Sequence, residues 1–569
     1  MVNWSLAGIR NALPSNTHIV DFTDAGAISD GITANDMAFQ KLVDTVKTPV
    51  TIYFPKGKYY FTKPMVLRQN VTIMGVSNDS TILNFKLDTT DALIKIFGSA
   101  TNITSEVVSG LNKDNQIIQV FDPEKFAAGD YIIIKEDDLQ LITSSWAKGT
   151  TGQIIKIDSI AGQDLYLASP LRRNYSGGNA TVTKLNMVQH SSIENLKIVR
   201  LDTNTAQSSN ILFEYAANCM VKCVESDNCN FAHIELDNST NIEISGCYIH
   251  NAFQYGDGGE GYGVAAQNTS GECLITDNIF DSLRHPMLMQ AGANGNVFSY
   301  NYAIHPIWAE AGFPVDAAGS IVLHGNYPYA NLLEGNVVQN IVIDNSHGEN
   351  GPYNTFYRNR AELYGFVMSL NAGNSENFVG NEITGKGFLK GNFVITGLDE
   401  YEYGNNLNNT IVPRGTCSIS TSSLYLSGPP AYYHDNSSWP PIGPPSVFNS
   451  DTIAAENRYN KGFYTPCSAA TSVDGNDTSN TGITPILTHY ASLTAYPNPT
   501  ESIVQLHFQN SSQLYIQEIN VLSPLGKILF KVNDGNEVNL MSLPDGIYFL
   551  RVRFSDNEQA TVKVLKQGQ

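Results

Sequence analysis

Hydrophobic and polar residues alternate in short runs along most of the chain, which is the spacing of β-strands. One early segment differs. Between Asn35 and Val46 the apolar residues recur at helical spacing, so we predict a short helix there. Strand-like runs follow directly, in VTIYFPKGKYYFTKPMVL and NVTIMGVSNDSTILNF. Many short strands with few helices indicate an all-β architecture.

From about residue 190 the strand pattern becomes a repeat. The segments SIENLK, CMVKCV, IEISGC, LITDNI, VFSYNY, LLEGNV, TFYRNR, FVGNEI and EYGNNL align on a shared Asn or small residue, with spacings of 28, 23, 32, 23, 35, 23, 22 and 24 residues. A period of about 23 residues is typical of one coil of a parallel β-helix, which buries its core by stacking coil on coil. We expect a hydrogen-bonded ladder along the axis at the aligned positions Asn195, Cys223, Gly246, Asn278, Asn301, Asn336, Asn359, Asn381 and Asn405.

The two largest spacings, 32 and 35 residues, exceed the repeat by nine and twelve residues, and each excess marks an inserted loop. The first loop is NAFQYGDGGEGYG, residues 251–263, and the second is PIWAEAGFPVDAAG, residues 306–319. Both follow an Ile-His pair that ends in His250 or His305. We therefore expect the two loops to leave the same corner of the coil, two coils apart, and to form the walls of a groove.

Histidines recur beside these loops. His324 and His347 each lie twelve residues before a ladder Asn, so we predict that they occupy the same position in adjacent coils and point outward. Adjacent strands lie about 4.8 Å apart, which would make the two imidazoles neighbours. Tyr262 and His285 each lie sixteen residues before their ladder Asn and should stack in the same way.

The regions outside the repeat have other patterns. Short alternating strands around Gly-Asp turns predict a small β insert that sits on the N-terminal cap and takes no part in the chemistry. The last segment, with alternating strands and Gly turns, predicts a small β-sandwich. The expected organisation is a cap with the first coils (1–99), the insert (100–185), the β-helix with a covering segment (186–465), a linker (466–491) and the β-sandwich (492–569).

Composition and charge narrow the functional classes. The net charge of −20, without a basic stripe, excludes a nucleic-acid partner. No run of 18 apolar residues is present, so we expect no membrane span. The chain starts without an apolar signal segment, so an exported form would have its signal peptide missing from this chain. Among the seven cysteines, Cys417 and Cys467 are candidates for a disulfide.

Two stretches resemble known families. The order DF, GA, DG, an amphipathic helix, YFPKGKYYF and NVTIMG resembles, over about 80 residues, the N-terminal cap of pectin-lyase-like right-handed parallel β-helices. That superfamily consists largely of polysaccharide lyases and glycoside hydrolases, so the resemblance implies this fold and a polysaccharide substrate. YPNP, LGK and GIYFLRV, in about the last 75 residues, resemble the C-terminal sorting domain of type IX secretion in Bacteroidetes-like bacteria. That resemblance implies the type IX machinery as a partner and secretion or surface display.

The cluster of histidines suits a polysaccharide lyase. Elimination across C4–C5 of a uronic acid needs a base for the C5 proton, a cation for the carboxylate and an acid for the leaving oxygen. We predict His324 or His347 as the base, because imidazole titrates near neutral pH, with Arg284 as the cation and Tyr262 as the acid. The residues predicted to bind substrate are His285, His305, His250, Glu260, Trp308, Asp316, Asp344, Arg358 and Arg360.

Two other functions remain open at this point. A glycoside hydrolase needs two carboxylates, for which Glu260, Glu310, Asp316 and Asp344 are candidates, but the close Asp pair followed by Gly-His that marks the polygalacturonase-like branch is missing. A non-catalytic glycan-binding surface protein explains the coils and the sorting domain but not the clustered His and Arg. The sequence establishes no cofactor and leaves Ca²⁺ open. Some lyases of the resembled superfamily use Ca²⁺ for neutralisation, and Asp257, Glu260, Asp316 and Asp344 could hold such an ion, although they show no ordered ligand spacing. We expect a monomer.

Overall fold

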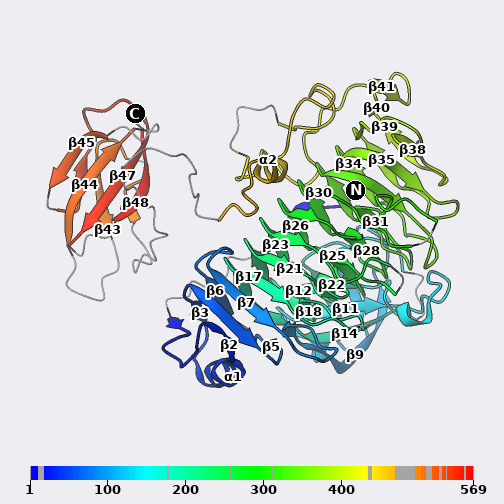
Figure 1. Ribbon diagram of the computed structural model, residues 1–569, viewed down its shortest axis with the longest axis horizontal. Helices are drawn as coiled ribbons and strands as arrows, with labels where there is room; N and C mark the ends of the chain where they lie inside the picture. Colours follow the sequence, from blue (N-terminus) through cyan, green and yellow to red (C-terminus); the bar gives the residue numbers. More distant parts are fainter. Residues whose placement is uncertain are drawn as a thin grey trace. The chain divides into compact units, whose positions relative to one another are not determined.

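The computed structural model describes two compact units of the chain, residues 1–470 and 471–569 (Figure 1). The described residues are 2–10, 18–175, 179–204, 206–256, 258–310, 312–433 and 439–467 in the first unit, and 494–498, 500–507, 515–523, 528–533, 535–555 and 559–567 in the second. Most of the predicted linker, from residue 468 onward, lies outside the described residues.

Three stacks of short parallel strands form the three sides of a β-helix in the first unit (Figure 1). The first stack contains β1 (Ile19–Asp21), β3 (Val50–Phe54), β6 (Val71–Gly75), β16 (Ser192–Glu194), β20 (Met220–Lys222), β23 (Glu243–Ser245), β26 (Leu274–Thr276), β29 (Val297–Ser299), β32 (Leu332–Glu334), β34 (Thr355–Tyr357), β36 (Asn377–Val379) and β39 (Tyr401–Tyr403). The second contains β2 (Asp30–Ala34), β4 (Gly57–Phe61), β7 (Thr81–Phe85), β17 (Lys197–Arg200), β21 (Glu225–Asp227), β24 (Tyr248–His250), β27 (Ile279–Asp281), β30 (Tyr302–Ile304), β37 (Glu382–Ile383) and β40 (Asn405–Leu407), with β41 (Thr410–Val412) antiparallel at its end.

The third stack carries the candidate site. It contains β5 (Met65–Val66), β8 (Ile94–Phe97), β18 (Ile211–Glu214), β22 (Ala232–Asp237), β25 (Tyr262–Gln267), β28 (His285–Met289), β31 (Ile321–Leu323) and β38 (Asn392–Val394). Two longer strands, β33 (Val337–Ile343) and β35 (Arg360–Met368), run through both the second and third stacks and join them into one sheet. A two-residue pair, β15 (Val188–Gln189) with β19 (Ala216–Ala217), lies at a corner.

Alternate strand residues point inward and form aligned apolar columns. In the first stack, Ile52, Ile73, Ile193 and Val221 pair from coil to coil, and all four are fully buried. Stacking of identical coil positions thus produces one continuous core. The predicted helix is confirmed as α1 (Asp36–Thr45), which packs Phe39 and Val43 against this core.

The predicted asparagine ladder is confirmed in six coils. Each side-chain amide donates to the side-chain oxygen of the Asn in the next coil, over 2.9–3.1 Å, because the parallel register places identical positions above one another. All members are fully buried: Asn278, Asn301, Asn336, Asn359, Asn381 and Asn405.

The alignment is wrong by one residue at Asn195, Cys223 and Gly246. Ser245 pairs with Thr276, so Cys247, not Gly246, lies level with Asn278, and the Cys247 N–H donates to the Asn278 side chain over 2.9 Å. The three residues instead have left-handed turn backbone, with φ between 54° and 64°. Asn, Gly and other small residues occur both at this turn and at the ladder position next to it. The sequence alignment therefore placed the turn residues of these three coils on the ladder.

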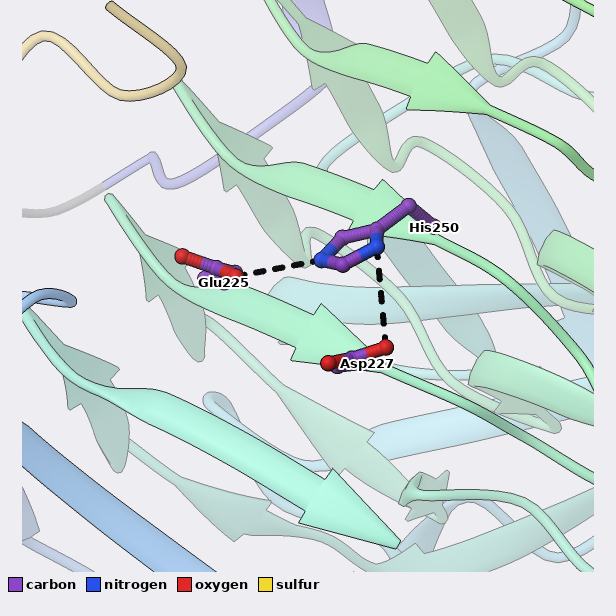
Figure 2. A group of neighbouring side chains, drawn as sticks. All are labelled: Glu225, Asp227 and His250. Atoms are coloured by element: carbon purple, nitrogen blue, oxygen red, sulfur yellow. Dashed lines mark hydrogen bonds and ion pairs between the residues drawn. The ribbon is translucent and has the colours of Figure 1, made fainter.

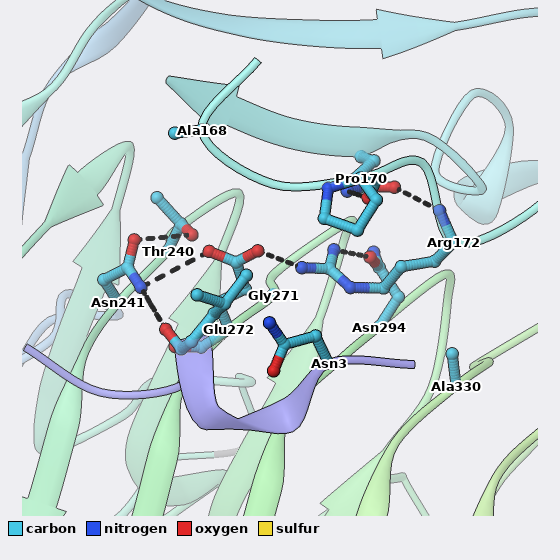
Figure 3. Close-up of polar contacts among 12 residues, drawn as sticks. Asn3, Ala168, Pro170, Arg172, Thr240, Asn241, Gly271, Glu272, Asn294 and Ala330 are labelled. Atoms are coloured by element: carbon cyan, nitrogen blue, oxygen red, sulfur yellow. Dashed lines mark hydrogen bonds and ion pairs between the residues drawn. The ribbon is translucent and has the colours of Figure 1, made fainter. Parts of the chain in front are cut away.

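The insert is a closed antiparallel barrel, and its predicted placement on the cap is wrong. Its strands are β9 (Ser99–Ser109), β10 (Ile117–Val120), β11 (Tyr131–Lys135), β12 (Gln153–Ala161), β13 (Asp164–Leu167) and β14 (Thr181–Asn186), with single 3₁₀ turns at Pro123–Lys125 and Ser145–Ala147. The barrel packs along later coils: Arg172 pairs with Glu272 and donates to Asn294 over 2.7 Å (Figure 3). The Tyr329 hydroxyl also donates to the Gly152 carbonyl over 2.8 Å. These partners lie more than 90 residues apart in sequence, so no local pattern indicated them.

Residues 418–433 and 439–467, which we name the strap, return along the outside of the coils and include α2 (Ala454–Asn460). Arg458 in the strap pairs with Asp277 over 2.8 Å, and Cys467 forms a disulfide with Cys223. The candidate pair Cys417 and Cys467 is therefore not bonded, and Cys417 is an exposed free thiol. The N-terminal 3₁₀ turn Trp4–Leu6 docks on the coils too, where the Trp4 indole donates to the Ala330 carbonyl over 2.7 Å.

The second unit is the predicted small β-sandwich. One sheet contains β42 (Thr494–Tyr496), β43 (Ile503–His507) and β46 (Glu537–Asn539); the other contains β44 (Ile516–Leu522), β45 (Ile528–Asn533), β47 (Gly546–Phe554) and β48 (Gln559–Lys566). Val504 and Val538 of the first sheet pack with Val521 and Leu550 of the second. Among the helices in the described residues, none is long and apolar enough to cross a membrane.

Candidate active site

A pocket of about 730 Å³ opens on the outer face of the third stack. The loop before β25 and the loop before β31 leave the same corner two coils apart, since His250 pairs with Asp281 and Asp281 with Ile304. The loops touch, because the Ala309 N–H donates to the Tyr255 carbonyl over 3.1 Å. The predicted paired loops are thus confirmed. The described lining residues are Trp146, Gln207, Phe231, Gly258, Gly259, Tyr262, Gln267, Asn268, Arg284, Gln290, His324, Ser346 and His347.

His324 is held by a carboxylate in the next coil. Its Nδ1 lies 2.8 Å from Asp344 Oδ2, and both side chains are largely buried. The register explains the pair: Leu323 is level with Ile343, so Asp344 follows directly above His324. Burial raises the pKa of Asp344, but the hydrogen bond and charge of His324, with the Ser346 amide, lower that pKa below its usual value. When the ionised Asp344 accepts the Nδ1–H, Nε2 is the ring nitrogen that is not held by Asp344.

His347 lies next to His324, but not at the coil position that the sequence predicted. The residue level with His324 is Asp344, so the prediction that the two histidines share a coil position is wrong. His347 lies in the turn after β33, which brings its ring centroid to 4.8 Å from that of His324. The expected contact between the imidazoles is therefore confirmed. Burial and the neighbouring His324 lower the pKa of His347, against the opposing charge of Asp344.

Tyr262 and His285 stack as predicted. They are paired in the strand register, and their ring centroids lie 5.3 Å apart at 28°. His285 in turn lies 6.0 Å from His324, so a chain of rings crosses the pocket. Burial, followed by the charges of His324 and Arg284, lowers the pKa of His285 to about 3. His285 is therefore neutral at physiological pH, and its Nδ1–H donates to the Gly319 carbonyl over 3.0 Å.

Arg284 supplies a positive charge to the pocket. Its guanidinium donates to the Gly256 carbonyl, and Nε is buried without a hydrogen-bond partner among the described atoms. Burial raises the pKa of the nearby Glu260 carboxyl, against the charge of Arg284. Burial also raises the pKa of Tyr262, so its phenol is protonated at neutral pH.

Two of the predicted histidines lie on the second stack, outside this pocket. His250 Nε2 lies 3.1 Å from Glu225 Oε1 and its Nδ1 lies 3.6 Å from Asp227 Oδ1 (Figure 2). Their spacing would suit a metal ion, but the Lys197 ammonium lies 2.7 Å from Glu225 and 3.1 Å from Asp227, and already supplies the cation. His305 is 59% exposed and contacts Asp281 over 2.8 Å.

The two predicted arginines anchor the strap instead of facing a substrate. Arg358 is 1% exposed and donates to the carbonyls of Ile442 and Pro444 over 3.0 and 2.6 Å. Arg360 is 2% exposed, pairs with Glu382 over 2.9 Å and donates to the Asp451 carbonyl. Their assignment to substrate binding is wrong, because the strap covers them.

The remaining predicted residues lie beside the pocket but do not line it. Glu260 is buried at the end of the first loop. Trp308 stacks on Phe313 in the second loop, with ring centroids 4.5 Å apart. Asp316 accepts a hydrogen bond from the Tyr364 hydroxyl over 3.1 Å. The described lining residues of the pocket include no Asp or Glu.

A polar row in register with His324 was missed. Gln290 lies in the coil before His324 and Gln267 in the coil before that; the Gln290 amide donates to Gln267 over 2.7 Å. Gln267 donates to Glu235 over 2.9 Å, and Ser209 donates to the same carboxyl over 2.6 Å. Burial raises the pKa of Glu235 to about 7 and that of Asp237 to about 6. Gln267 and Gln290 lie eleven residues before their ladder Asn and His324 lies twelve before its own, so a count at fixed spacing placed them at different coil positions.

Comparisons with known proteins agree with this architecture. Residues 19–120 match the family model of rhamnogalacturonase A/epimerase, pectate lyase-like proteins, and residues 494–567 match that of the secretion system C-terminal sorting domain. Together with the coils described above, these matches support a right-handed parallel β-helix of the pectin-lyase-like type, followed by a secretion sorting domain. Such a domain indicates a protein that is secreted or held at the cell surface.

Individual relatives are distant. The chain is 24% identical over 231 residues to the capsule K1-specific depolymerase of Klebsiella phage K64-1, a match that covers 39% of this chain and 25% of the relative. The tailspike gp49 of Pseudomonas phage LKA1 is similar in structure, with a TM-score of 0.49, 16% identity and 64% of each chain covered. An exopolygalacturonase of Thermotoga maritima has a TM-score of 0.30 at 12% identity, with 66% of this chain and 82% of the enzyme covered. This chain thus spans about a quarter of the depolymerase and 64% of the tailspike.

Proposed function

We propose that this protein is a secreted polysaccharide lyase that cleaves a uronic-acid-containing glycan by β-elimination. The observation that carries the proposal is the make-up of the pocket: a carboxylate-held histidine, a second histidine, an arginine and a tyrosine, with no Asp or Glu among its described lining residues. The depolymerase name of the curated relative and the sorting domain support a glycan substrate and export by type IX secretion.

Each of these residues has its own role in the proposed reaction. His324 Nε2 takes the C5 proton of the uronate, since its Nδ1–H is held by Asp344. Arg284 pairs with the uronate carboxylate, which acidifies that proton and stabilises the enolate-like transition state. The C5–H electrons form the C4–C5 double bond, the C4–O bond breaks, and the Tyr262 phenol protonates the leaving oxygen. His347 contacts the substrate beside the base.

A panel of polysaccharides tests the proposal. Polygalacturonate, alginate, hyaluronan and neutral glucans are incubated with the full chain, and products are assayed for the ultraviolet absorbance of a conjugated double bond and for new reducing ends. A lyase produces both signals on a uronate polymer. His324→Ala should lower kcat by roughly 10²- to 10⁴-fold while the variant still folds, as circular dichroism would show. Full activity in both His324→Ala and His347→Ala would contradict this site.

A glycoside hydrolase is the second candidate, because of one pair of carboxylates. Glu235 and Asp237 are two residues apart on β22, so their Cα atoms lie about 6.6 Å apart on one face of the strand. Inverting hydrolases place an acid and a base roughly 6.5–9.5 Å apart. New reducing ends without the double bond, lost in Glu235→Gln but kept in His324→Ala, would favour this function over the lyase.

A further inference from the structure

The barrel has a loop, residues 136–152, that is seated directly on the β-helix beside the pocket. The Asn326 side-chain oxygen accepts the backbone N–H groups of Thr143 and Ser144 over 3.0 and 3.1 Å. At the other end of the loop, the Thr269 hydroxyl donates to the Thr150 carbonyl over 2.6 Å. Two coils of the β-helix therefore hold the barrel loop at both ends.

Two glycines of the coils make this close contact possible. A Cβ on Gly348 would lie 1.9 Å from Thr143 Oγ1, and a Cβ on Gly292 would lie 1.9 Å from the Thr150 carbonyl oxygen. Both glycines also have left-handed backbone, with φ of 87° and 71°. No other residue fits there without moving the loop.

The barrel loop is also held from within. Asp138, 1% exposed, accepts the N–H groups of Gly149 and Thr151 over 2.9 and 3.1 Å. Its 3₁₀ turn, Ser145–Ala147, buries Ala147 completely and turns Trp146 outward. A rigid backbone thus presents one side chain to the pocket at little cost in conformational entropy.

Trp146 extends the chain of rings in the pocket. Its ring centroid lies 5.6 Å from that of His347, and it is 50% exposed although it is a large apolar group. The other tryptophans are engaged: Trp4 is 4% exposed, Trp308 stacks on Phe313, and the Trp439 indole donates to the Tyr300 hydroxyl. Of the four tryptophans, Trp146 is the one among the described lining residues of the pocket. An indole combines a flat apolar face with a polar N–H, which suits the apolar face of a pyranose and its hydroxyl rim.

We propose that the barrel loop forms a sugar-binding subsite in which Trp146 stacks on the pyranose ring next to the one held at His324. This subsite rests on the proposed function for the identity of the neighbouring uronate. Trp146 positions the chain; it does not exchange protons with it. The barrel is thereby a substrate-binding module of the groove and determines the register in which the glycan lies across the base.

Binding to an inactive form tests the subsite separately from the reaction. Oligosaccharides from polygalacturonate, alginate and hyaluronan are titrated into the full chain carrying His324→Ala, with calorimetry and tryptophan fluorescence as readouts. Adding Trp146→Ala should weaken the binding of the recognised oligosaccharide roughly 3- to 10-fold, which is the range of an aromatic stacking contact. Trp146→Phe should recover part of this loss while removing the fluorescence response. Leu139→Ala, an equally exposed apolar residue of the same loop that does not line the pocket, should bind as the parent does.

Turnover gives the second readout. In the active chain, Trp146→Ala should raise KM by the same factor and leave kcat near its original value. Unchanged affinity in Trp146→Ala, or an equal loss in Leu139→Ala, would overturn the subsite. Binding that depends on Trp146 without any unsaturated product would overturn the lyase and keep the subsite. Failure of all three oligosaccharides to bind would overturn both.

Discussion

At the scale of single residues, the site depends on which nitrogen of His324 is free. The Asp344 carboxylate holds Nδ1–H, so Nε2 carries the lone pair that a base requires. Asp344 itself does not line the pocket, which makes it a positioning residue whose effect should appear in the chemical step and not in binding.

Asp344→Asn should therefore lower kcat by roughly 10²-fold with little change in KM, because an amide can stabilise the wrong imidazole tautomer. Steady-state kinetics on the recognised polysaccharide measure both constants. Asp281→Asn is the matched control, since it breaks a histidine–carboxylate contact of the same 2.8 Å length outside the pocket. Equal losses in the two variants would argue against the assigned base.

His285 makes stability depend on pH. The pKa of His285 falls from 6.5 to about 3 on folding. Between these two values only the unfolded chain takes up the proton. The contribution of the neutral His285 to the free energy of unfolding is therefore complete above pH 6.5 and is lost as the pH falls from 6.5 toward 3. His285→Phe keeps the ring against Tyr262 but cannot bind a proton. Thermal unfolding at a series of pH values should show a lower unfolding temperature for this variant at pH 7 and a shallower decline below pH 6.5. Parallel curves would contradict the buried neutral imidazole.

The sequence predicted the neighbouring imidazoles, but it assigned Asp344 to substrate binding and not to the hydrogen bond with His324. Counting from the ladder Asn assumes that each coil has the same length at every side, and the turn that contains His347 breaks that assumption. Asp344 lies 20 residues from His324, three short of the repeat, so the regular period concealed it.

At the scale of elements, buried polar contacts attach the strap to the coils. The Arg358 guanidinium donates hydrogen bonds to the strap carbonyls of Ile442, Pro444 and Thr421. The repeat in the sequence does not indicate this role, because Arg358 is buried by the strap, whose contacting residues lie about 60 to 90 positions later in the chain.

Arg358→Leu should destabilise the protein by roughly 2–4 kcal/mol, the cost of several unpaired buried carbonyls, and leave kcat/KM unchanged below the unfolding temperature. Chemical denaturation and kinetics at low temperature separate the two effects. Arg414→Leu, at an exposed arginine, should change neither. A loss of kcat/KM in the folded Arg358→Leu variant would instead support a role of Arg358 in substrate binding.

The coils and paired loops could be predicted because each strand repeats a local pattern that parallel stacking amplifies. The docking of the barrel could not. Its partners Asn326 and Gly348 lie about 180 and 200 residues from the loop they hold, and a glycine that admits a neighbouring loop looks like any other turn glycine. The position of Trp146 beside the pocket could therefore be recognised only from the structure.

At the scale of the whole molecule, the two units have separate cores. A chain that ends at Ala470 should keep the unfolding transition of the β-helix and its full rate of depolymerisation, and should lose export from the producing cell. Calorimetry on the full chain should show a further transition that the shorter chain lacks. A shorter chain that no longer folds would show that the second unit is part of the catalytic one.

The strap has a consequence for how this solenoid can change in length. Each coil adds about 4.8 Å along the axis, and the strap is attached at Cys223, Asp277 and Arg358, on coils that are several steps apart. Duplication or loss of a coil between these points would shift the coil residues that bind the strap by about 4.8 Å along the axis, so the strap could no longer contact all of them. Repeat proteins commonly gain and lose units, but here such changes can be accommodated only beyond the attached coils. The number of coils beneath the strap is therefore set by a segment outside the repeat.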